Sequence, residues 1–129
     1  DQSGSFSNAR ICKAPIYSIQ EQLALPRAIP RCDLFWSPHY NVPLAPIRAK
    51  KRIVTIHDAC HLALQHQLGW KERLYAKMML RQAVSRSDAV ITDSYFSQKE
   101  LSRFLKIDKS AIHVIYPGVD FNRFSNPCS

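Results

Sequence analysis

Glycine is scarce in this sequence of 129 residues, and its three glycines, Gly4, Gly69 and Gly118, lie far apart. Isolated glycines cannot form G-x-G-x-x-G or a P-loop, because both motifs need closely spaced glycines that let phosphate groups approach the backbone. The sequence therefore excludes a self-contained dinucleotide or nucleoside-triphosphate cradle of the usual kind. Any nucleotide that the protein binds must receive its phosphate contacts from elsewhere.

Paired cysteines and long apolar runs are also missing. The four cysteines, Cys12, Cys32, Cys60 and Cys128, include no C-x-x-C pair and no zinc-ribbon spacing. We interpret them as reduced thiols, because a disulfide scaffold is denser in cysteine and poorer in core residues. No stretch approaches the roughly 20 apolar residues that cross a bilayer, and no signal peptide is visible. These features favour a cytoplasmic protein with room for one globular domain.

Acidic side chains are outnumbered by basic ones, 10 against 18, which gives a formal charge of +8. This excess favours anionic partners such as nucleic acid, anionic lipid headgroups or phosphorylated small molecules. Aromatic residues are not interleaved with basic ones as in RNA-binding sheets, so we expect no nucleic-acid partner. The basic run at residues 50–52 precedes a strand, and we expect it in a solvated loop.

Proline is concentrated near the start of the chain, and Pro26 is expected to kink or end a helix over residues 18–25. Further expected helices cover residues 73–85 and 96–105. Expected strands cover residues 33–37, 53–56, 88–92 and 112–116, with a weaker one over 9–12. Short apolar strands that alternate with helices predict an α/β fold, a Rossmann-like parallel sheet with helices on both faces.

The clearest helix is the one over residues 73–85. Its expected inward stripe consists of Leu74, Tyr75, Met78, Met79, Gln82 and Ala83. Ser94 or Ser97 can cap the helix over residues 96–105, and Ser97 with Glu100 fits a capping box. The pair Pro117-Gly118 suits a type II turn, in which the glycine adopts a positive φ.

Polar side chains follow each expected strand directly, in segments 37–40, 57–58, 93–94 and 117–120. Ligands of parallel sheets bind beyond the carboxyl ends of the strands, so these segments together predict one site. His39 can act there as a general base or position a hydroxyl. The alternative is a histidine in a polar loop that contacts only backbone.

His57 and Asp58 allow two functional interpretations. They can face the same cleft as His39, with Asp58 also capping a following helix. The run H-D-A-C-H also resembles H-E-x-x-H, in which His57 and His61 would bind zinc, although His57 follows a strand instead of lying in a helix. The alternative functions are therefore a zinc-dependent hydrolase and a non-catalytic basic α/β module. Ser94 begins a helix that can receive an anion, but we expect it to act as a cap.

Four segments in this order resemble the amino-terminal half of the family-four retaining glycosyltransferases, in particular mannosyltransferase-like members. The segments are residues 33–41, 53–58, 87–101 and 112–124. The family signature is long, with D-x-(I/V)-(I/V)-(T/A)-x-S-x-x-S followed by I-x-V-(I/V)-x-(N/P)-G-V-D-x-x-x-F. The residues that meet it are Asp88, Ser94, Ser97, Gly118, Val119, Asp120 and Phe124, with Pro117 at a position often held by Asn.

The resemblance implies a GT-B glycosyltransferase, with two Rossmann-like domains that face a cleft. Such an enzyme moves a sugar from a nucleotide-diphosphate donor, here GDP-mannose, to a hydroxyl with retained configuration, in polysaccharide or glycoconjugate biosynthesis. It needs no cofactor and usually no metal. The resemblance makes His39 the catalytic residue. The substrate-binding residues that it implies are Tyr40, Asn41, His57, Asp58, Ser94, Gly118 and Asp120.

Parts of the family pattern have no counterpart in this sequence. They are the first strand with its glycine-bearing loop, and the carboxyl-terminal domain that holds the donor diphosphate. We therefore expect residues 1–129 to be the later portion of the acceptor-side domain, inactive in isolation and with exposed hydrophobic surface. The expected partners are a nucleotide-sugar donor and a carbohydrate or lipid-linked acceptor. We expect a cytoplasmic location, with peripheral contact at the inner face of the membrane.

Overall fold

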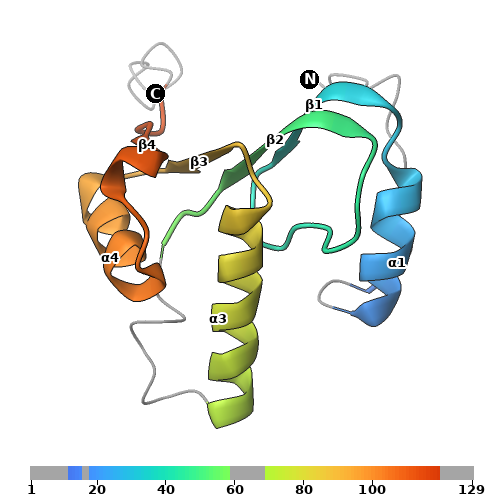
Figure 1. The fold of residues 1–129 in the computed structure, drawn as a ribbon, viewed down its shortest axis with the longest axis horizontal. Helices are drawn as coiled ribbons and strands as arrows, with labels where there is room; N and C mark the ends of the chain where they lie inside the picture. The colour runs from blue at the N-terminus through green and yellow to red at the C-terminus, as the bar shows by residue number, and fades with distance from the viewer. Residues whose placement is uncertain (1–11, 16–17, 59–68, 120–129) are drawn as a thin grey trace, which may run out of the picture.

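The computed structural model describes residues 12–15, 18–58 and 69–119. Its helices are α1 (Ile19–Ala28), α3 (Trp70–Ser85) and α4 (Tyr95–Leu105), with one 3₁₀ turn, η1 (Lys109–Ala111) (Figure 1). Its strands are β1 (Cys32–Ser37), β2 (Ala49–Thr55), β3 (Ala89–Thr92) and β4 (Ile112–Val114). The alternation of strands and helices confirms the predicted α/β fold. The weak strand expected over residues 9–12 lies outside the described residues except for Cys12, which is in no strand.

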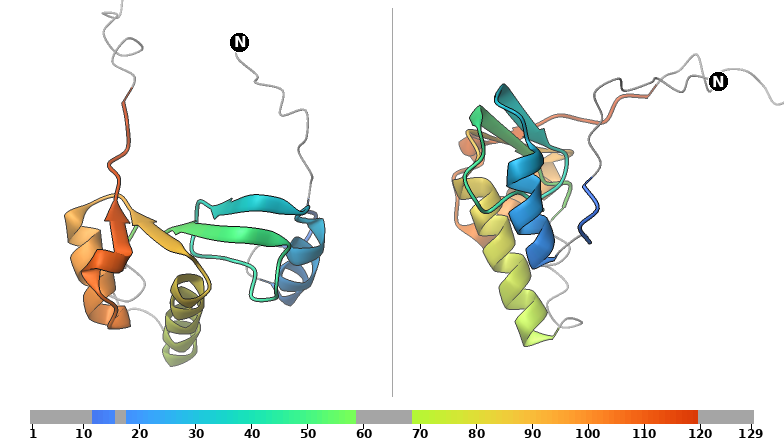
Figure 2. Two further views of the ribbon diagram at one scale, coloured as in Figure 1. Left: turned by 45° about the horizontal axis from the view of Figure 1, so that its top comes forward. Right: turned by 90° about the vertical axis from the view of Figure 1, so that its right-hand side faces the viewer.

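The four strands form one parallel sheet in the order β1-β2-β3-β4, the order of the chain itself. Each crossover therefore advances in the same direction, and right-handed connections place the crossover helices on the same side. Figures 1 and 2 show α1, α3 and α4 together on one side of the sheet. The sequence predicts helices on both faces, whereas the described helices occupy one.

The hydrophobic core lies between the sheet and helices α3 and α4. The sheet contributes Val54 near the end of β2, Val90 on β3 and Ile112 on β4, and Ile56 directly after β2 joins them. The helices contribute Leu80, Ala83, Leu101 and Leu105. Every second side chain along a strand faces the helices, so the β-branched runs of the sequence supply the sheet side of this core.

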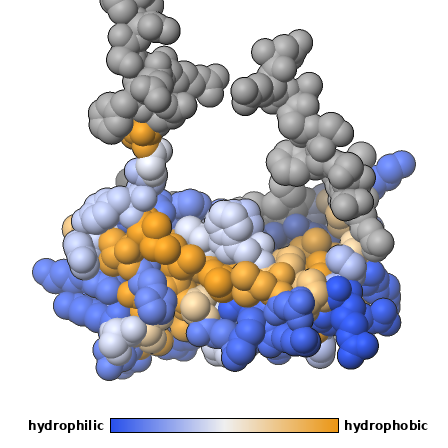
Figure 3. Space-filling model, turned by 90° about the horizontal axis from the view of Figure 1, so that it is seen from above, coloured by the Kyte–Doolittle hydropathy of each residue, from blue (hydrophilic) through white to orange (hydrophobic). Residues whose placement is uncertain are grey.

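The other face of the sheet carries large apolar side chains that remain exposed. Leu34 and Trp36 on β1 and Ile115 after β4 are all more than half exposed. Trp36 pairs in register with Ile53, and its indole Nε1 donates a hydrogen bond to Thr55 Oγ1 at 3.0 Å. Figure 3 shows an apolar band across this face. One face of this parallel sheet thus meets solvent within the described part of the chain.

Helix α3 is rotated relative to the predicted stripe. Its buried side chains are Ala76, Met79, Leu80 and Ala83, which recur at the i, i+3, i+4, i+7 spacing of one helical face. Of the predicted stripe, Met79 and Ala83 are buried, but Leu74, Tyr75 and Met78 are exposed. The prediction was wrong there because apolar residues occupy nearly every side of this helix, so periodicity alone does not select the inner face.

Strand β2 begins at Ala49, earlier than predicted, so the basic run of residues 50–52 belongs to the strand and not to a loop. Lys50 forms an ion pair with Asp33 at 2.6 Å, and Lys51 forms one with Asp88 at 2.6 Å. Both pairs join neighbouring strands across exposed surface, where unlike charges side by side support strand pairing.

Two proline predictions also need correction. Pro26 does not end the helix, because α1 continues to Ala28 and a proline near the end of a helix removes only one late hydrogen bond. Neither described glycine has a positive φ, so Pro117-Gly118 does not form a type II turn. The cap of α1 is Ser18, whose side chain accepts a hydrogen bond from the Glu21 backbone N–H at 3.0 Å.

Candidate functional site at the carboxyl edge of the sheet

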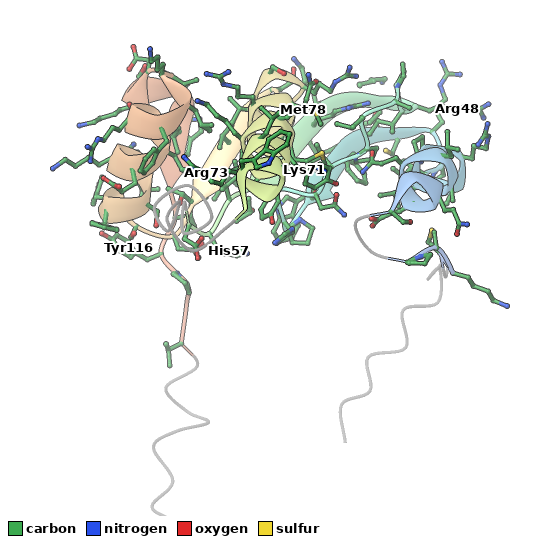
Figure 4. The ribbon with its side chains drawn as sticks, turned by 90° about the horizontal axis from the view of Figure 1, so that it is seen from below. Arg48, His57, Lys71, Arg73, Met78 and Tyr116 are labelled. Atoms are coloured by element: carbon green, nitrogen blue, oxygen red, sulfur yellow. The ribbon has the colours of Figure 1, made fainter. Side chains whose placement is uncertain are left out.

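The carboxyl ends of the parallel strands meet at one edge of the sheet, as the sequence predicts. Figure 4 shows His57, which follows β2, and Tyr116, which follows β4, on the same edge of the molecule. Tyr116 contacts Tyr95 at the start of α4 edge to face, with ring centroids 6.1 Å apart. Segments that are distant in sequence therefore share this edge, which is called the strand-end site below.

His57 is bound at both ring nitrogens. Nδ1 lies 2.6 Å from Asp93 Oδ2, and Nε2 lies 3.0 Å from the backbone oxygen of Pro38. A carbonyl oxygen and an ionised carboxylate only accept hydrogen bonds, so both contacts are satisfied together when each ring nitrogen carries a hydrogen, as in the imidazolium form. His57 therefore links the ends of three neighbouring strands, because Pro38 follows β1 and Asp93 follows β3.

The surroundings of His57 raise its pKa above the ordinary value. The hydrogen bond to Asp93 is the largest cause, burial opposes it, and the Pro38 carbonyl and the negative charges of Asp93 and Asp58 add to the rise. The side chain of His57 is 54% exposed, so solvent screens these charges and the pair is a moderate electrostatic contact. The same charges favour the protonated form of the His57 ring.

His39 is held in a defined orientation next to β1. Its Nδ1 accepts a hydrogen bond from the Asn41 backbone N–H at 3.3 Å, and its backbone oxygen accepts one from Ser37 Oγ at 2.7 Å. The Tyr40 ring lies against the imidazole, with centroids 4.1 Å apart. Because Nδ1 accepts, the neutral ring carries its proton on Nε2, which makes that nitrogen a donor.

Asn41, predicted to bind substrate, connects the loop after β1 to helix α1. Its Nδ2 donates to Glu21 Oε2 at 2.9 Å, and its Oδ1 accepts from Gln22 Nε2 at 3.4 Å. Gln22 Oε1 in turn accepts from the Leu44 backbone N–H at 2.8 Å. These bonds from α1 fix the loop that carries His39, so the side chain of Asn41 has a structural task as well.

Ser94 caps helix α4, as the sequence predicts. Its Oγ accepts a hydrogen bond from the Ser97 backbone N–H at 3.1 Å, and its hydroxyl also donates to Ser97 Oγ. Ser97 lies inside the helix and is not the cap. The amino end of α4 thus points its partial positive charge toward the strand-end site.

The other predicted residues are placed less fully. Asp58 is exposed beside His57, and Gly118 lies in an extended exposed segment after β4, where an added Cβ would meet nothing within 4 Å. Asp120 and His61 lie outside the described residues. Asp93 also belongs to the site; the sequence includes it in the strand-end segment 93–94 but assigns it no role of its own.

The zinc interpretation gains no support from His57. Both of its ring nitrogens are engaged, so in this geometry neither offers a lone pair to a metal. Among the residues that the structure describes, no three His, Cys, Asp or Glu side chains are grouped to hold a metal ion. His61, the second ligand of that hypothesis, is outside them.

A shallow hollow of the described surface lies at the opposite edge of the sheet. Arg31, Arg48, Ala49 and Lys50 line it, at the amino ends of β1 and β2. Figure 4 shows Arg48 far from His57. Ligands of parallel sheets bind at the carboxyl ends, so this open basic hollow is a poorer candidate than the strand-end site.

Comparison with known proteins gives one result. The model of a family described as Glycosyltransferase Family 4 matches residues 5–123. No curated protein and no solved structure matches the chain. In the described ranges, every helix is too short or too polar to pass through a bilayer.

Proposed function

Because this chain belongs to glycosyltransferase family 4, we propose that its strand-end site takes part in moving a sugar from a nucleotide-diphosphate donor to a hydroxyl acceptor. The family assignment supports general glycosyltransferase activity with a nucleotide-sugar donor and an acceptor. We further propose that residues 1–129 form the later portion of the acceptor-side domain. Complete transfer then requires a donor-binding domain that closes over this edge.

The orientation of His39 is the observation that carries this proposal. With Nδ1 accepting the Asn41 N–H, the hydrogen of the neutral His39 ring is on Nε2, and we propose that this N–H is directed to an oxygen of the reacting sugar or of the departing phosphate when the substrates bind. A donor at this point stabilises negative charge that grows on the phosphate oxygen as the glycosidic bond breaks. His39 therefore serves as a positioned donor and not as a general base.

The remaining residues of the strand-end site have supporting roles in this scheme. We propose that Tyr40 and Asp58 bind acceptor hydroxyls, and that the amino end of α4 at Ser94 favours an anionic group. Gly118, which follows β4, completes the same edge in the proposal, and Asp120 is assigned to substrate binding from the family signature alone. The donor that we propose is GDP-mannose. Its mannose is transferred with retention of the anomeric configuration and without a metal.

The test is His39→Ala in the full-length protein, with transfer assayed against several sugar nucleotides including GDP-mannose. Loss of a positioned donor is expected to lower turnover by about 10²-fold or more while leaving the circular dichroism spectrum unchanged. His113→Ala is the matched control, because His113 is an exposed histidine on β4 whose register partner is Ile91 on the open face. Equal turnover of the His39→Ala variant and the wild type would remove His39 from the mechanism.

A further inference from the structure

Helix α3 presents apolar side chains to solvent on the side directly opposite its buried face. Trp70, Leu74 and Met78 are 70%, 63% and 46% exposed. Residues four apart lie one above the other on a helix, so these three form a continuous stripe along two turns. Isolated exposed apolar residues are ordinary, but a tryptophan-led stripe on the outward side of a helix is not explained by packing.

Basic side chains border this stripe. Lys71, Lys77 and Arg81 are exposed, and each lies within one turn of a stripe residue. The Lys71 ammonium lies 5.5 Å from the centroid of the Trp70 ring. Among the described side chains, no carboxylate forms an ion pair with Lys77 or Arg81. The outer face of α3, defined as these three apolar and three basic residues, therefore combines exposed apolar area with uncompensated positive charge.

The outer face of α3 is also accessible. Helix α3 extends well past the ends of α1 and α4, and Figures 1 and 2 show its amino-terminal turns projecting from the described body of the molecule. In Figure 4, which looks along this helix, Lys71 and Met78 are displayed around its projecting end. A flat partner can therefore reach these turns without meeting the other described helices first.

We propose that the outer face of α3 docks on an anionic lipid bilayer. Trp70, Leu74 and Met78 enter the boundary between headgroups and acyl chains, and the three cations reach lipid phosphates. Charge complementarity selects this occupant, since each Lys or Arg near an anionic bilayer contributes about 1 kcal/mol to binding. A second copy of the chain would instead bring like charges face to face, and leucine and methionine offer no stacking surface to nucleic-acid bases.

Docking at this face is separate from the transfer chemistry, because vesicle binding and sugar transfer are measured independently. Failure of the wild-type protein to bind anionic vesicles, with normal transfer to a soluble acceptor, would refute the docking proposal and leave the proposed function intact. Loss of transfer with normal vesicle binding would do the reverse. When the protein both binds vesicles and transfers sugar, an acceptor linked to a lipid can reach the strand-end site at the bilayer surface.

The test measures co-sedimentation of the full chain with vesicles of phosphatidylcholine alone and of phosphatidylcholine mixed equally with phosphatidylglycerol. We expect binding to the anionic vesicles that weakens with salt, and little binding to the neutral ones. Leu74→Ser with Met78→Ser should lower the partition coefficient by at least about 10-fold, because apolar burial is lost. Lys77→Glu with Arg81→Glu should lower it by at least about 30-fold, which corresponds to two contributions of about 1 kcal/mol each.

A matched control separates this face from net charge. Lys99 and Arg103 form an exposed pair at the same spacing on α4, so Lys99→Glu with Arg103→Glu makes the same charge change elsewhere. This variant should keep most of the binding. Equal losses for the two charge variants, unchanged binding of the serine variant, or absence of binding to anionic vesicles would each overturn the proposal. So would tighter binding to single-stranded DNA than to vesicles, or concentration-dependent dimers abolished by the serine substitutions.

Discussion

The contact between His57 and Asp93 makes a sharp prediction about pH. In Asp93→Asn the carboxylate that most strongly raises the pKa of His57 is gone, so the pKa of that imidazole should fall toward its ordinary value of about 6.5. The wild-type pair is 2.6 Å long, but the side chains are 54% and 31% exposed. After discounting for solvent screening, the pair contributes about 0.2–1 kcal/mol to the free energy of unfolding.

The sign of the pH dependence follows from the raised pKa. A group whose pKa is higher in the folded state stabilises the fold fully below its unfolded pKa, and that stabilisation is lost as pH rises through the folded pKa. The wild type should therefore exceed Asp93→Asn in stability by about 0.2–1 kcal/mol near pH 5.5. The difference should shrink toward zero at a second, higher pH chosen above the raised pKa of His57, where the ring is neutral in both proteins.

Urea denaturation at the two pH values measures the stability, and proton NMR titration of the imidazole Cε1–H measures the pKa of His57. Asp88→Asn is the matched control, because it breaks an ion pair of the same length, Lys51–Asp88, at the other end of β3. Its effect should be the same at both pH values, since the lowered pKa of Asp88 lies far below both. An unchanged His57 pKa in Asp93→Asn would refute the reasoning.

Two predictions concern the elements that support the site. Leu101→Ala should lower the free energy of unfolding by about 2–5 kcal/mol, because Leu101 is fully buried between α4 and the sheet. Leu74→Ala, at an exposed position, should change it by less than about 0.5 kcal/mol, and equal urea midpoints for the two would contradict the core described above. Ser94→Ala should cost about 1 kcal/mol through loss of the α4 cap, whereas Ser85→Ala, at the end of α3, should cost little. Thermal melting compares this pair, and identical transitions would contradict the capping role.

The strands and the amino end of α4 were predictable from the sequence because local signals determine them. The β-branched run 53–56 can hardly form anything but a strand, and Ser94 directly before the helix is a typical cap. The start of β2 was missed because Lys50 and Lys51 look like loop residues until their partners are known, which are Asp33 on β1 and Asp88 directly before β3.

Contacts across the sheet were beyond the reach of the sequence. The polar strand ends predicted one shared edge, and the parallel order of the strands brings them there. The pairing of His57 with Asp93 depends on the register of β2 and β3, which no local pattern encodes. The same limit applies to α3, where the choice between the side of Leu74 and the side of Leu80 depends on what α4 and the sheet present to the helix.

The strand order has a consequence for how the fold is built. Because β1, β2, β3 and β4 are neighbours in space in the order in which they occur in the chain, each strand-and-helix unit rests on the unit before it, as in a repeat protein. Pairing can therefore propagate from one unit to the next without closing a long loop. His57 follows β2 and forms hydrogen bonds to Pro38 after β1 and to Asp93 after β3, so it holds the ends of three successive strands together.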